Sequence, residues 1–116
     1  RILIMSKDTL KNPTQEEMLI VSMIRAARGV LGWSQPTLAK RSGLSLIALA
    51  RLESNVTSPR LSTVSRLKAA IEEAGIQVIE GQPSGGFTLQ VSARAIGLAA
   101  ESASRNEGGN GIDDDI

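Results

Sequence analysis

The sequence predicts a mainly α-helical domain that ends in a β-hairpin. Two observations lead to this fold class. Apolar residues recur at helical spacing in four segments between residues 15 and 74, and glycine or proline separates these segments. The period then changes to two in "IQVIE" and "FTLQVS", which read as strands on either side of the turn-rich "GQPSGG". At 116 residues, the chain has room for one domain with a modest core.

The first helix is predicted over residues 15–31. Thr14 and Glu17 have the spacing of a capping box, in which each side chain accepts a hydrogen bond from the other residue's backbone N–H. Gly32 can end the helix in a left-handed turn. The expected buried face consists of Ile20, Met23, Ile24, Ala27, Val30 and Leu31.

Three shorter helices are predicted to follow. Ser34 caps the second, Pro36 occupies its first turn, where a missing N–H costs nothing, and Gly43 ends it. Ser45 caps the third helix. "SNVTSPR" is a loop, because a proline disfavours helical geometry in the residue before it. We expect the fourth helix to be capped by Ser62 and to stop at Gly75.

The last third of the chain is predicted to hold the hairpin and a weaker helix. A lone two-stranded hairpin is marginal in water, so it must pack on the helices or on another chain. The alternating apolar residues of the second strand make the hairpin our first candidate for a dimer contact, through Phe87, Leu89 and Val91, and the end of the fourth helix is the alternative. The predicted organisation is an N-terminal arm (1–13), a helical domain (14–75), the hairpin (76–92), a weak alanine-rich helix (93–105) and a disordered acidic tail (106–116).

Composition argues against several classes of function. The chain has no histidine, cysteine or tyrosine, which removes the commonest general base, the commonest zinc ligand and all thiolate chemistry. We therefore expect neither an enzyme nor a metal or cofactor site. No apolar run approaches the length that spans a bilayer, and the lack of cysteine fits a reducing compartment. The expected location is the cytoplasm, without membrane contact.

Charge is unevenly distributed along the chain, although the net charge is +1. Residues 21–68 contain eight basic side chains and one acid, Glu53, whereas residues 69–116 contain two basic side chains and eight acids. A basic half attracts polyanions even when the whole chain is nearly neutral. A solvated surface is the alternative explanation of the same pattern.

The stretch "LAKRSGLSLIALARLES", residues 38–54, contains two short helices with one glycine between them. Where two helices cross steeply the first must be narrow, which Ala39 permits, and the short turn needs a positive φ, which Gly43 adopts without strain. Leu49 and Leu52 then face inward, and residues 45–47, 50 and 51 stay outside. This pattern is that of a helix-turn-helix.

From about Glu16 to Gly75, the chain resembles the Cro/C1-type (XRE) helix-turn-helix family of phage and bacterial transcriptional regulators. "WSQPTLAKRSGLSLIALARLE" carries the family's small-residue, glycine and inward-leucine positions, and "P…STVSRLKAAIEEAG" is similar to its fourth helix. The resemblance implies a lambda-repressor-like helix-turn-helix domain of four to five helices in a prokaryotic or phage protein. It also implies binding to double-stranded DNA, as a homodimer and more often as a repressor.

The resemblance implies roles for individual residues. Arg28 and Glu53 match a buried salt bridge between the first and third helices, and Gln35 matches a position that contacts a phosphate and braces the recognition helix. Arg51 is our best candidate for a base contact, to guanine O6 and N7, with a phosphate contact as the alternative. Arg60 could contact a phosphate or lie in the minor groove. The residues expected at the DNA are Gln35, Thr37, Lys40, Arg41, Ser45, Leu46, Ile47, Ala50, Arg51, Ser54 and Arg60.

Leu46 and Ile47 depart from the family's pattern, which often has polar side chains at these positions. Two aliphatic side chains at the start of the recognition helix could contact thymine methyl groups. They could also form a sticky surface for a protein partner. A protein-binding adaptor, such as an anti-activator or an antitoxin-like module, therefore remains the second hypothesis.

Overall fold

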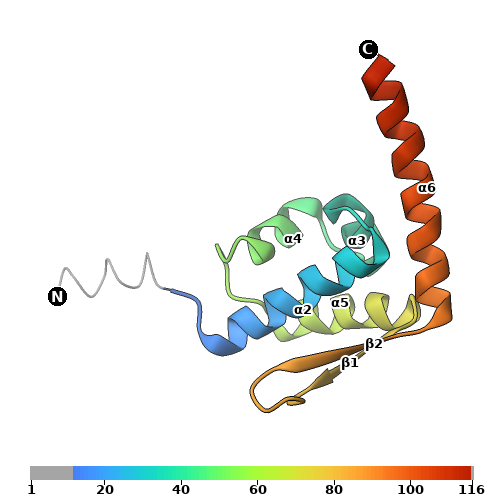
Figure 1. The fold of residues 1–116 in the computed structure, drawn as a ribbon. Helices are drawn as coiled ribbons and strands as arrows, with labels where there is room; N and C mark the ends of the chain where they lie inside the picture. Colours follow the sequence, from blue (N-terminus) through green and yellow to red (C-terminus); the bar gives the residue numbers. More distant parts are fainter. Residues whose placement is uncertain (1–11, 116) are drawn as a thin grey trace.

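The structure, a computed structural model, describes the backbone of residues 12–115 and the side chains of residues 12–105. Most of the expected N-terminal arm, residues 1–13, lies outside the described residues. The predicted fold class is confirmed: this part of the chain has five helices and a two-stranded antiparallel sheet (Figure 1). The elements are α2 (Gln15–Leu31), α3 (Gln35–Ser42), α4 (Leu46–Glu53), α5 (Leu61–Glu73), β1 (Ile76–Glu80), β2 (Phe87–Val91) and α6 (Ala93–Asp115).

The first helices begin and end at the predicted residues. Thr14 and Glu17 form a capping box, with hydrogen bonds of 3.0 and 3.1 Å between each side chain and the other's backbone N–H. Ser34 and Ser45 cap α3 and α4 by accepting hydrogen bonds from the third helical N–H. Gly32 ends α2 with a φ of 69°. A residue with a side chain would be strained in this left-handed conformation.

The predicted cap of α5 is wrong. The helix begins at Leu61, one residue before Ser62, and Arg60 is the N-cap, without a side-chain hydrogen bond. Arg60 has extended geometry, with a φ of −83° and a ψ of 150°, and its carbonyl accepts the first helical hydrogen bond from Val64 at 2.9 Å. The backbone after Pro59 thus starts the helix as soon as geometry allows, and no hydroxyl is needed.

Helix α6 continues beyond its predicted end. It runs to Asp115, so it also covers residues 106–115, where the sequence predicts a disordered tail. Its first turns pack against α2, and Ala95 and Ser102 are buried there. Because starting a helix costs far more than extending one, a helix that is nucleated by packing can continue into a segment of poor propensity.

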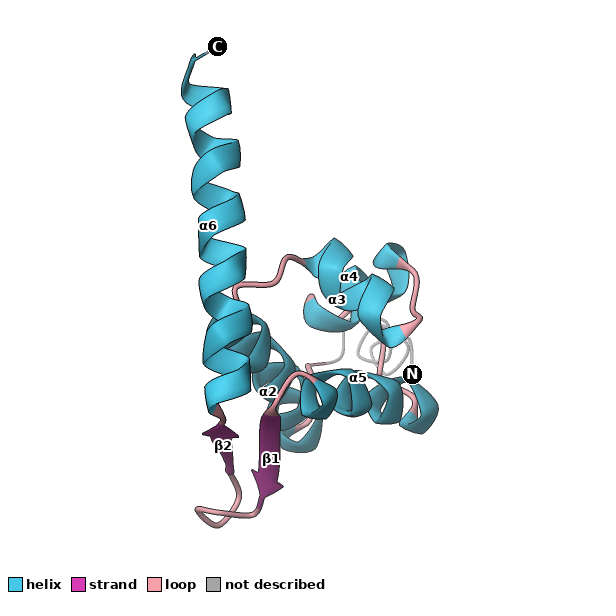
Figure 2. Cartoon of the chain, turned by 90° about the vertical axis from the view of Figure 1, so that its right-hand side faces the viewer, coloured by secondary structure: helices cyan, strands magenta, loops and turns pink. Residues whose placement is uncertain are grey.

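The core lies between α2 and α5 and is covered from three sides. Figures 1 and 2 show α3 and α4 on one side of these two helices, the hairpin on the opposite side and α6 at one end. Trp33, between α2 and α3, is 4% exposed and belongs to this core. The largest fully buried side chains are those of Met23, Ile24, Leu31, Leu38, Leu49, Leu67, Ile71, Ile76 and Val21.

The hairpin contributes one face to this core. In the antiparallel register, Ile76 pairs with Val91 and Val78 with Leu89, so these side chains point to the same face of the sheet. Ile76 is buried, and Val78 and Leu89 pack against the helical core. Packing on α2 and α5 thus stabilises a hairpin that would be marginal alone.

Candidate nucleic-acid interface

The turn between α3 and α4 has the geometry of a helix-turn-helix. Gly43 ends α3 with a φ of 75°, and the next N–H, that of Leu44, donates to the Ala39 carbonyl at 2.9 Å. Ala39 is 3% exposed, and Leu49 is fully buried. The small side chain and the glycine therefore let α4 cross close to α3, as the sequence predicts.

Glu53, the last residue of α4, joins three helices. Its side chain is buried, and the carboxylate accepts hydrogen bonds from Arg28 Nε and Nη2 of α2, at 2.9 Å each. Gln35 Nε2, at the start of α3, donates to the same carboxylate at 2.9 Å. A buried carboxylate needs such partners, and the bidentate pair fixes its orientation. The Arg28–Glu53 salt bridge that the resemblance implies is therefore present. Gln35 also braces α4, through its hydrogen bond to the Glu53 carboxylate.

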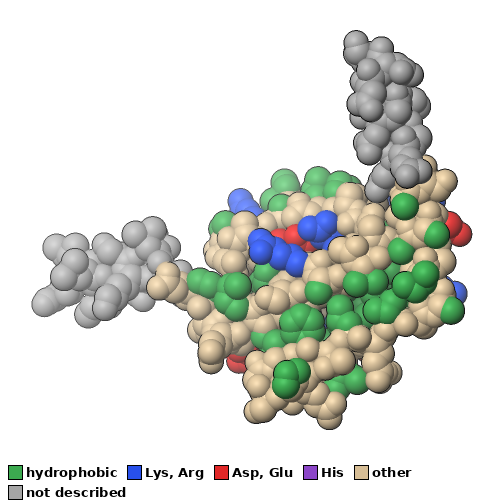
Figure 3. Space-filling model, viewed as in Figure 1, with side chains coloured by type: hydrophobic (Ala, Val, Ile, Leu, Met, Phe, Trp, Pro, Cys, Tyr) green, Lys and Arg blue, Asp and Glu red, His purple; other side chains and the backbone are tan. Residues whose placement is uncertain are grey.

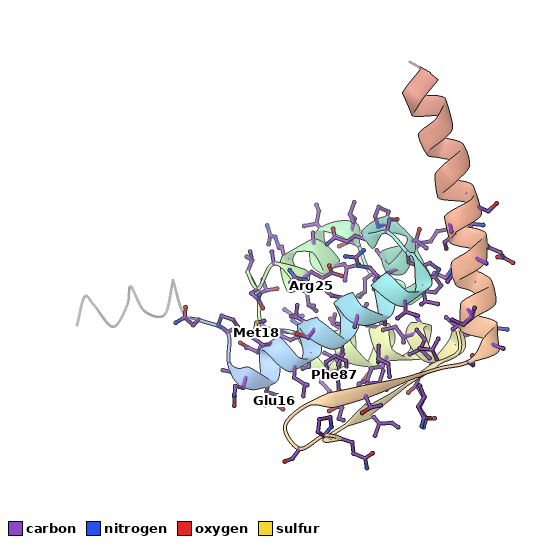
Figure 4. The ribbon with its side chains drawn as sticks, in the orientation of Figure 1. Glu16, Met18, Arg25 and Phe87 are labelled. Carbon is purple, nitrogen blue, oxygen red and sulfur yellow. The ribbon has the colours of Figure 1, made fainter. Side chains whose placement is uncertain are left out.

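Arg25 is a residue that the sequence analysis missed. Its Nη2 donates to the Glu53 backbone carbonyl at 2.5 Å, so it satisfies a carbonyl at the C-terminal end of α4. Arg25 and Arg28 are three residues apart and therefore share one face of α2, which was the available signal. Figure 3 shows Lys and Arg side chains on both sides of a small acidic area between α2 and α4, and Figure 4 labels Arg25 there. The position of α4 is thus set by cations from α2.

The outer face of α4 is exposed and largely apolar at its start. Leu46 is 45% exposed and Ile47 is 67% exposed, and Arg51 is exposed one turn later. Ala50 is half-buried. The two serines at the ends, Ser45 and Ser54, are exposed, and their hydroxyls already bond the helix backbone. An exposed helix of this shape can enter a major groove, with Arg51 as its one cation.

Arg51 and Arg60 flank a shallow groove of about 500 Å³ between α4 and the loop that precedes α5. Neither guanidinium has an ion-pair partner among the described residues. The groove is lined by hydroxyl groups as well as cations, which is the chemistry that binds phosphate oxygens. Its lining residues are Ser45, Ile47, Ala48, Arg51, Leu52, Thr57, Ser58, Pro59, Arg60 and Thr63.

The remaining predicted DNA contacts lie on α3. Lys40 and Arg41 are exposed in its last turn, and the Arg41 guanidinium lies 4.8 Å from the centre of the Trp33 ring. This cation–π contact restrains Arg41 beside the start of α3. The Thr37 hydroxyl lies 3.1 Å from the Ser34 hydroxyl in the first turn. Lys40 and Arg41 are therefore the exposed cations of α3.

The three residues that we expected at a dimer contact share one face of β2 but differ in exposure. Leu89 packs against the chain's own core, and Phe87 is half-buried beside α2 (Figure 4). Val91 is 38% exposed. The expectation that all three side chains face a second copy does not hold for Leu89, because the face it belongs to covers α2 and α5. Of the three residues, Val91 is the exposed one.

No helix among the described residues is long and apolar enough to cross a membrane. No group of three or more histidine, cysteine, aspartate or glutamate side chains in the described part of the chain could hold a metal ion.

A helix-turn-helix family model matches residues 24–77, from the middle of α2 to the start of β1. Over these residues the chain is similar to helix-turn-helix domains of the Cro/C1 type. The family is one of DNA-binding regulator domains and not of enzymes. Neither the curated proteins nor the solved structures contain a match to the chain.

Proposed function

We propose that this helix-turn-helix protein is a sequence-specific transcriptional regulator that binds DNA as a homodimer, with α4 in the major groove, and that it acts as a repressor. The observation that carries the proposal is the way α4 is held. Glu53 is joined to Arg28 and Gln35, and the opposite face of α4 remains exposed. Recognition needs a rigidly held helix, since a small displacement would lose the base contacts.

The proposed interface divides into base contacts and phosphate contacts. Arg51 is the base-reading candidate, because an arginine can donate two hydrogen bonds to guanine O6 and N7. Leu46 and Ile47 contact thymine methyl groups in the same groove. Lys40, Arg41 and Arg60 contact phosphates, which position the domain without reading sequence. Such a regulator acts in the cytoplasm, at the nucleoid.

A homodimer follows from the small number of base contacts that one domain can make. Two copies on a two-fold symmetric site double those contacts and give usable specificity. The proposed dimer contact is the hairpin, with Val91 as its exposed apolar residue. Both strands are sheet edges within the described residues, so their outer backbone groups are free to pair with another strand.

A protein-binding adaptor is the second candidate function. It is favoured by one observation, the exposure of Leu46 and Ile47 side by side at the start of α4. Exposed apolar neighbours of this kind are typical of protein-binding surfaces. In this case α4 would contact a partner protein, and Arg51 would be dispensable.

Selection of bound fragments from a random DNA pool at near-physiological salt, followed by sequencing, tests the proposal. A dimeric regulator is expected to enrich a palindrome whose half-sites lie about one helical turn apart. A recovered pool with the same composition as the input would contradict sequence-specific binding and favour the adaptor.

A further inference from the structure

An apolar groove lies between the first turns of α2 and the tip of the hairpin. Its volume is about 500 Å³. The apolar side chains that line it are those of Pro13, Met18, Leu19, Pro83 and Phe87. Figure 4 labels Met18 on α2 and Phe87 at the start of β2, and Figure 3 shows hydrophobic side chains along the seam between α2 and the hairpin. These lining residues lie outside the segment that matches the helix-turn-helix family, so DNA binding by that segment does not account for the groove.

The lining of this groove is unsuited to a charged ligand. Among the described residues that line it none is charged, and Gln15 and Ser22 supply the polar side chains. By contrast, the groove between α4 and the loop before α5 contains Arg51 and Arg60. Phosphate oxygens are bound most strongly by cationic side chains, which the groove beside α2 lacks. Its chemistry therefore fits an apolar occupant, whose burial removes apolar surface from water.

Large apolar side chains in the groove are only partly covered by the described part of the chain. Met18 is 37% exposed, and Leu19 and Phe87 are half-buried. A single exposed apolar side chain is common on a protein surface, but several that line one groove mark a place where another group packs. The described residues thus leave an apolar surface that a further segment can cover.

The sequence before α2 contains such a segment. Residues 2–5, Ile-Leu-Ile-Met, are four consecutive apolar residues, and they lie outside the described part of the chain. The described chain begins at Asn12, and Pro13, the next residue, already lines the groove. The backbone that connects residues 2–5 to α2 therefore reaches the domain at the edge of the groove.

The lengths of these segments match. The connecting residues 6–12 can span up to about 25 Å when extended, which is enough for a reversal of direction. They include Ser6, Asp8 and Asn12, residue types that favour turns. The part of α2 that lines the groove, from Gln15 to Ser22, is about 10 Å long, because a helix rises about 1.5 Å per residue. Four extended residues cover about 13 Å. Residues 2–5 can therefore fold back along α2 and cover the length of the groove.

We propose that residues 2–5 pack in this groove of their own chain, against Met18 and Phe87. The same chain is favoured over a second copy because a short tether holds the segment at an effective concentration of about the millimolar range. The contact joins the tip of the hairpin to α2. It also holds the N-terminal segment on the hairpin side of α2, away from α3 and α4 (Figures 1 and 2). The inference stands whether or not α4 binds DNA.

Spin labelling of the 116-residue chain tests this placement. The sequence contains no cysteine, so Ser6→Cys gives one site for a nitroxide next to residues 2–5 without changing them. In the ¹⁵N-labelled protein, backbone amides near the nitroxide lose signal intensity. We expect this loss at the hairpin amides of Gly86 and Phe87, and full intensity at Leu46 and Ile47 of α4. Loss at the α4 amides instead would place the segment on the recognition helix and overturn the proposal.

Two triple variants of the labelled chain separate apolar packing from the effect of the tether. The first replaces most of the apolar run: Ile2→Ser, Leu3→Ser and Ile4→Ser. We expect it to restore the hairpin signals, because the tether is kept and the apolar contacts are lost. The matched control replaces three charged residues of the same segment: Lys7→Ser, Asp8→Ser and Lys11→Ser. It should keep the signal loss. Equal hairpin intensities with and without the apolar run would overturn the proposal, since the tether alone would then explain them.

A mixed sample distinguishes the same chain from a second copy. It contains nitroxide-labelled chains without ¹⁵N and ¹⁵N-labelled chains without nitroxide. Contact within one chain predicts full intensity at Gly86 and Phe87 in this sample. Signal loss there would assign the groove to another copy and overturn the contact proposed here. On the groove side, Met18→Gln changes a side chain that is 37% exposed, so it should leave the fold intact and restore the hairpin signals of the Ser6→Cys chain.

Discussion

Arg28 donates two hydrogen bonds of 2.9 Å to Glu53, so the last turn of α2 is joined to the last residue of α4. The Glu53 side chain is 3% exposed and that of Arg28 is 23% exposed. Arg28→Ala would leave a buried carboxylate without its cation, which typically costs roughly 3–5 kcal/mol. We expect the free energy of unfolding, measured by urea denaturation, to fall by this amount.

Lys68→Ala is the control for this loss. It breaks the ion pair of Lys68 with Glu80, whose side chains are 34% and 45% exposed. Water already solvates such a pair, so its loss costs about 1 kcal/mol or less. A double variant with Arg28→Met and Glu53→Leu removes both buried charges and should lose less than Arg28→Ala. Equal losses in Arg28→Ala and Lys68→Ala would show that the buried pair has no special role.

Arg51→Ala separates DNA reading from protein binding. If Arg51 contacts guanine, the variant should lose about 1–3 kcal/mol of affinity for the selected palindrome and keep its affinity for unrelated DNA. Arg60→Ala is the matched variant, because Arg60 lies across the same groove and is proposed to contact a phosphate. It should weaken binding to both duplexes alike. Fluorescence anisotropy with both duplexes measures the difference.

Leu46→Asp tests the alternative function, in which α4 binds a partner protein and not DNA. Leu46 is exposed, so Leu46→Asp should leave the fold intact while adding a negative charge to α4. If Arg51→Ala is tolerated and Leu46→Asp abolishes function in cells, the adaptor function replaces the regulator. If both variants lose the palindrome, α4 lies in the groove.

Two glycines with positive φ should respond differently to alanine. Gly43 has a φ of 75° with no atom within 4 Å of an added Cβ, so Gly43→Ala costs the backbone strain alone, about 1–2 kcal/mol. Gly75 has a φ of 103°, and an added Cβ would collide with Ser92 and lie 3.1 Å from the Ala95 backbone nitrogen. Gly75→Ala should therefore lower the melting temperature more than Gly43→Ala. The reverse order would contradict this account of the two turns.

Local chemistry made much of the fold predictable. Thr14, Ser34, Ser45 and the glycines act within one turn of the chain, and the structure has each at its predicted helix end. The prediction of Ser62 as a cap was wrong. A serine near a helix start caps the helix only if the helix begins at the next residue, and α5 begins one residue before Ser62. Long-range packing was harder to predict. Leu89 alternates as an interface residue would, yet the hairpin folds back onto α2 and α5.

The candidate site was predictable to the extent that the family pattern covers it. Glu53 was expected to pair with Arg28, and Gln35 to contact a phosphate and brace α4; the Glu53 carboxylate accepts hydrogen bonds from both side chains. Arg25 contacts a backbone carbonyl, so no partner residue type marked it in the sequence.

The hairpin provides the last prediction, which concerns the oligomeric state. Val91 is 38% exposed and lies at the end of β2, where a second copy can pair along the open edge. Val91→Lys would place a charge in that contact, and lysine on an edge strand opposes strand pairing. We expect the wild type to sediment as a dimer and Val91→Lys to sediment as a monomer at the same concentration.

Ile96→Lys is the control for the dimer contact, because Ile96 is 57% exposed on α6 and lies outside the hairpin. It should remain a dimer if β2 forms the contact. On DNA, a monomeric Val91→Lys variant should bind a single half-site about as tightly as the wild type does, since α4 is untouched. The wild type is expected to bind the full palindrome more tightly than a half-site, because two linked domains bind together. The monomeric variant should lose this difference in affinity. A Val91→Lys variant that still sediments as a dimer would exclude this edge of the hairpin and direct attention to α6.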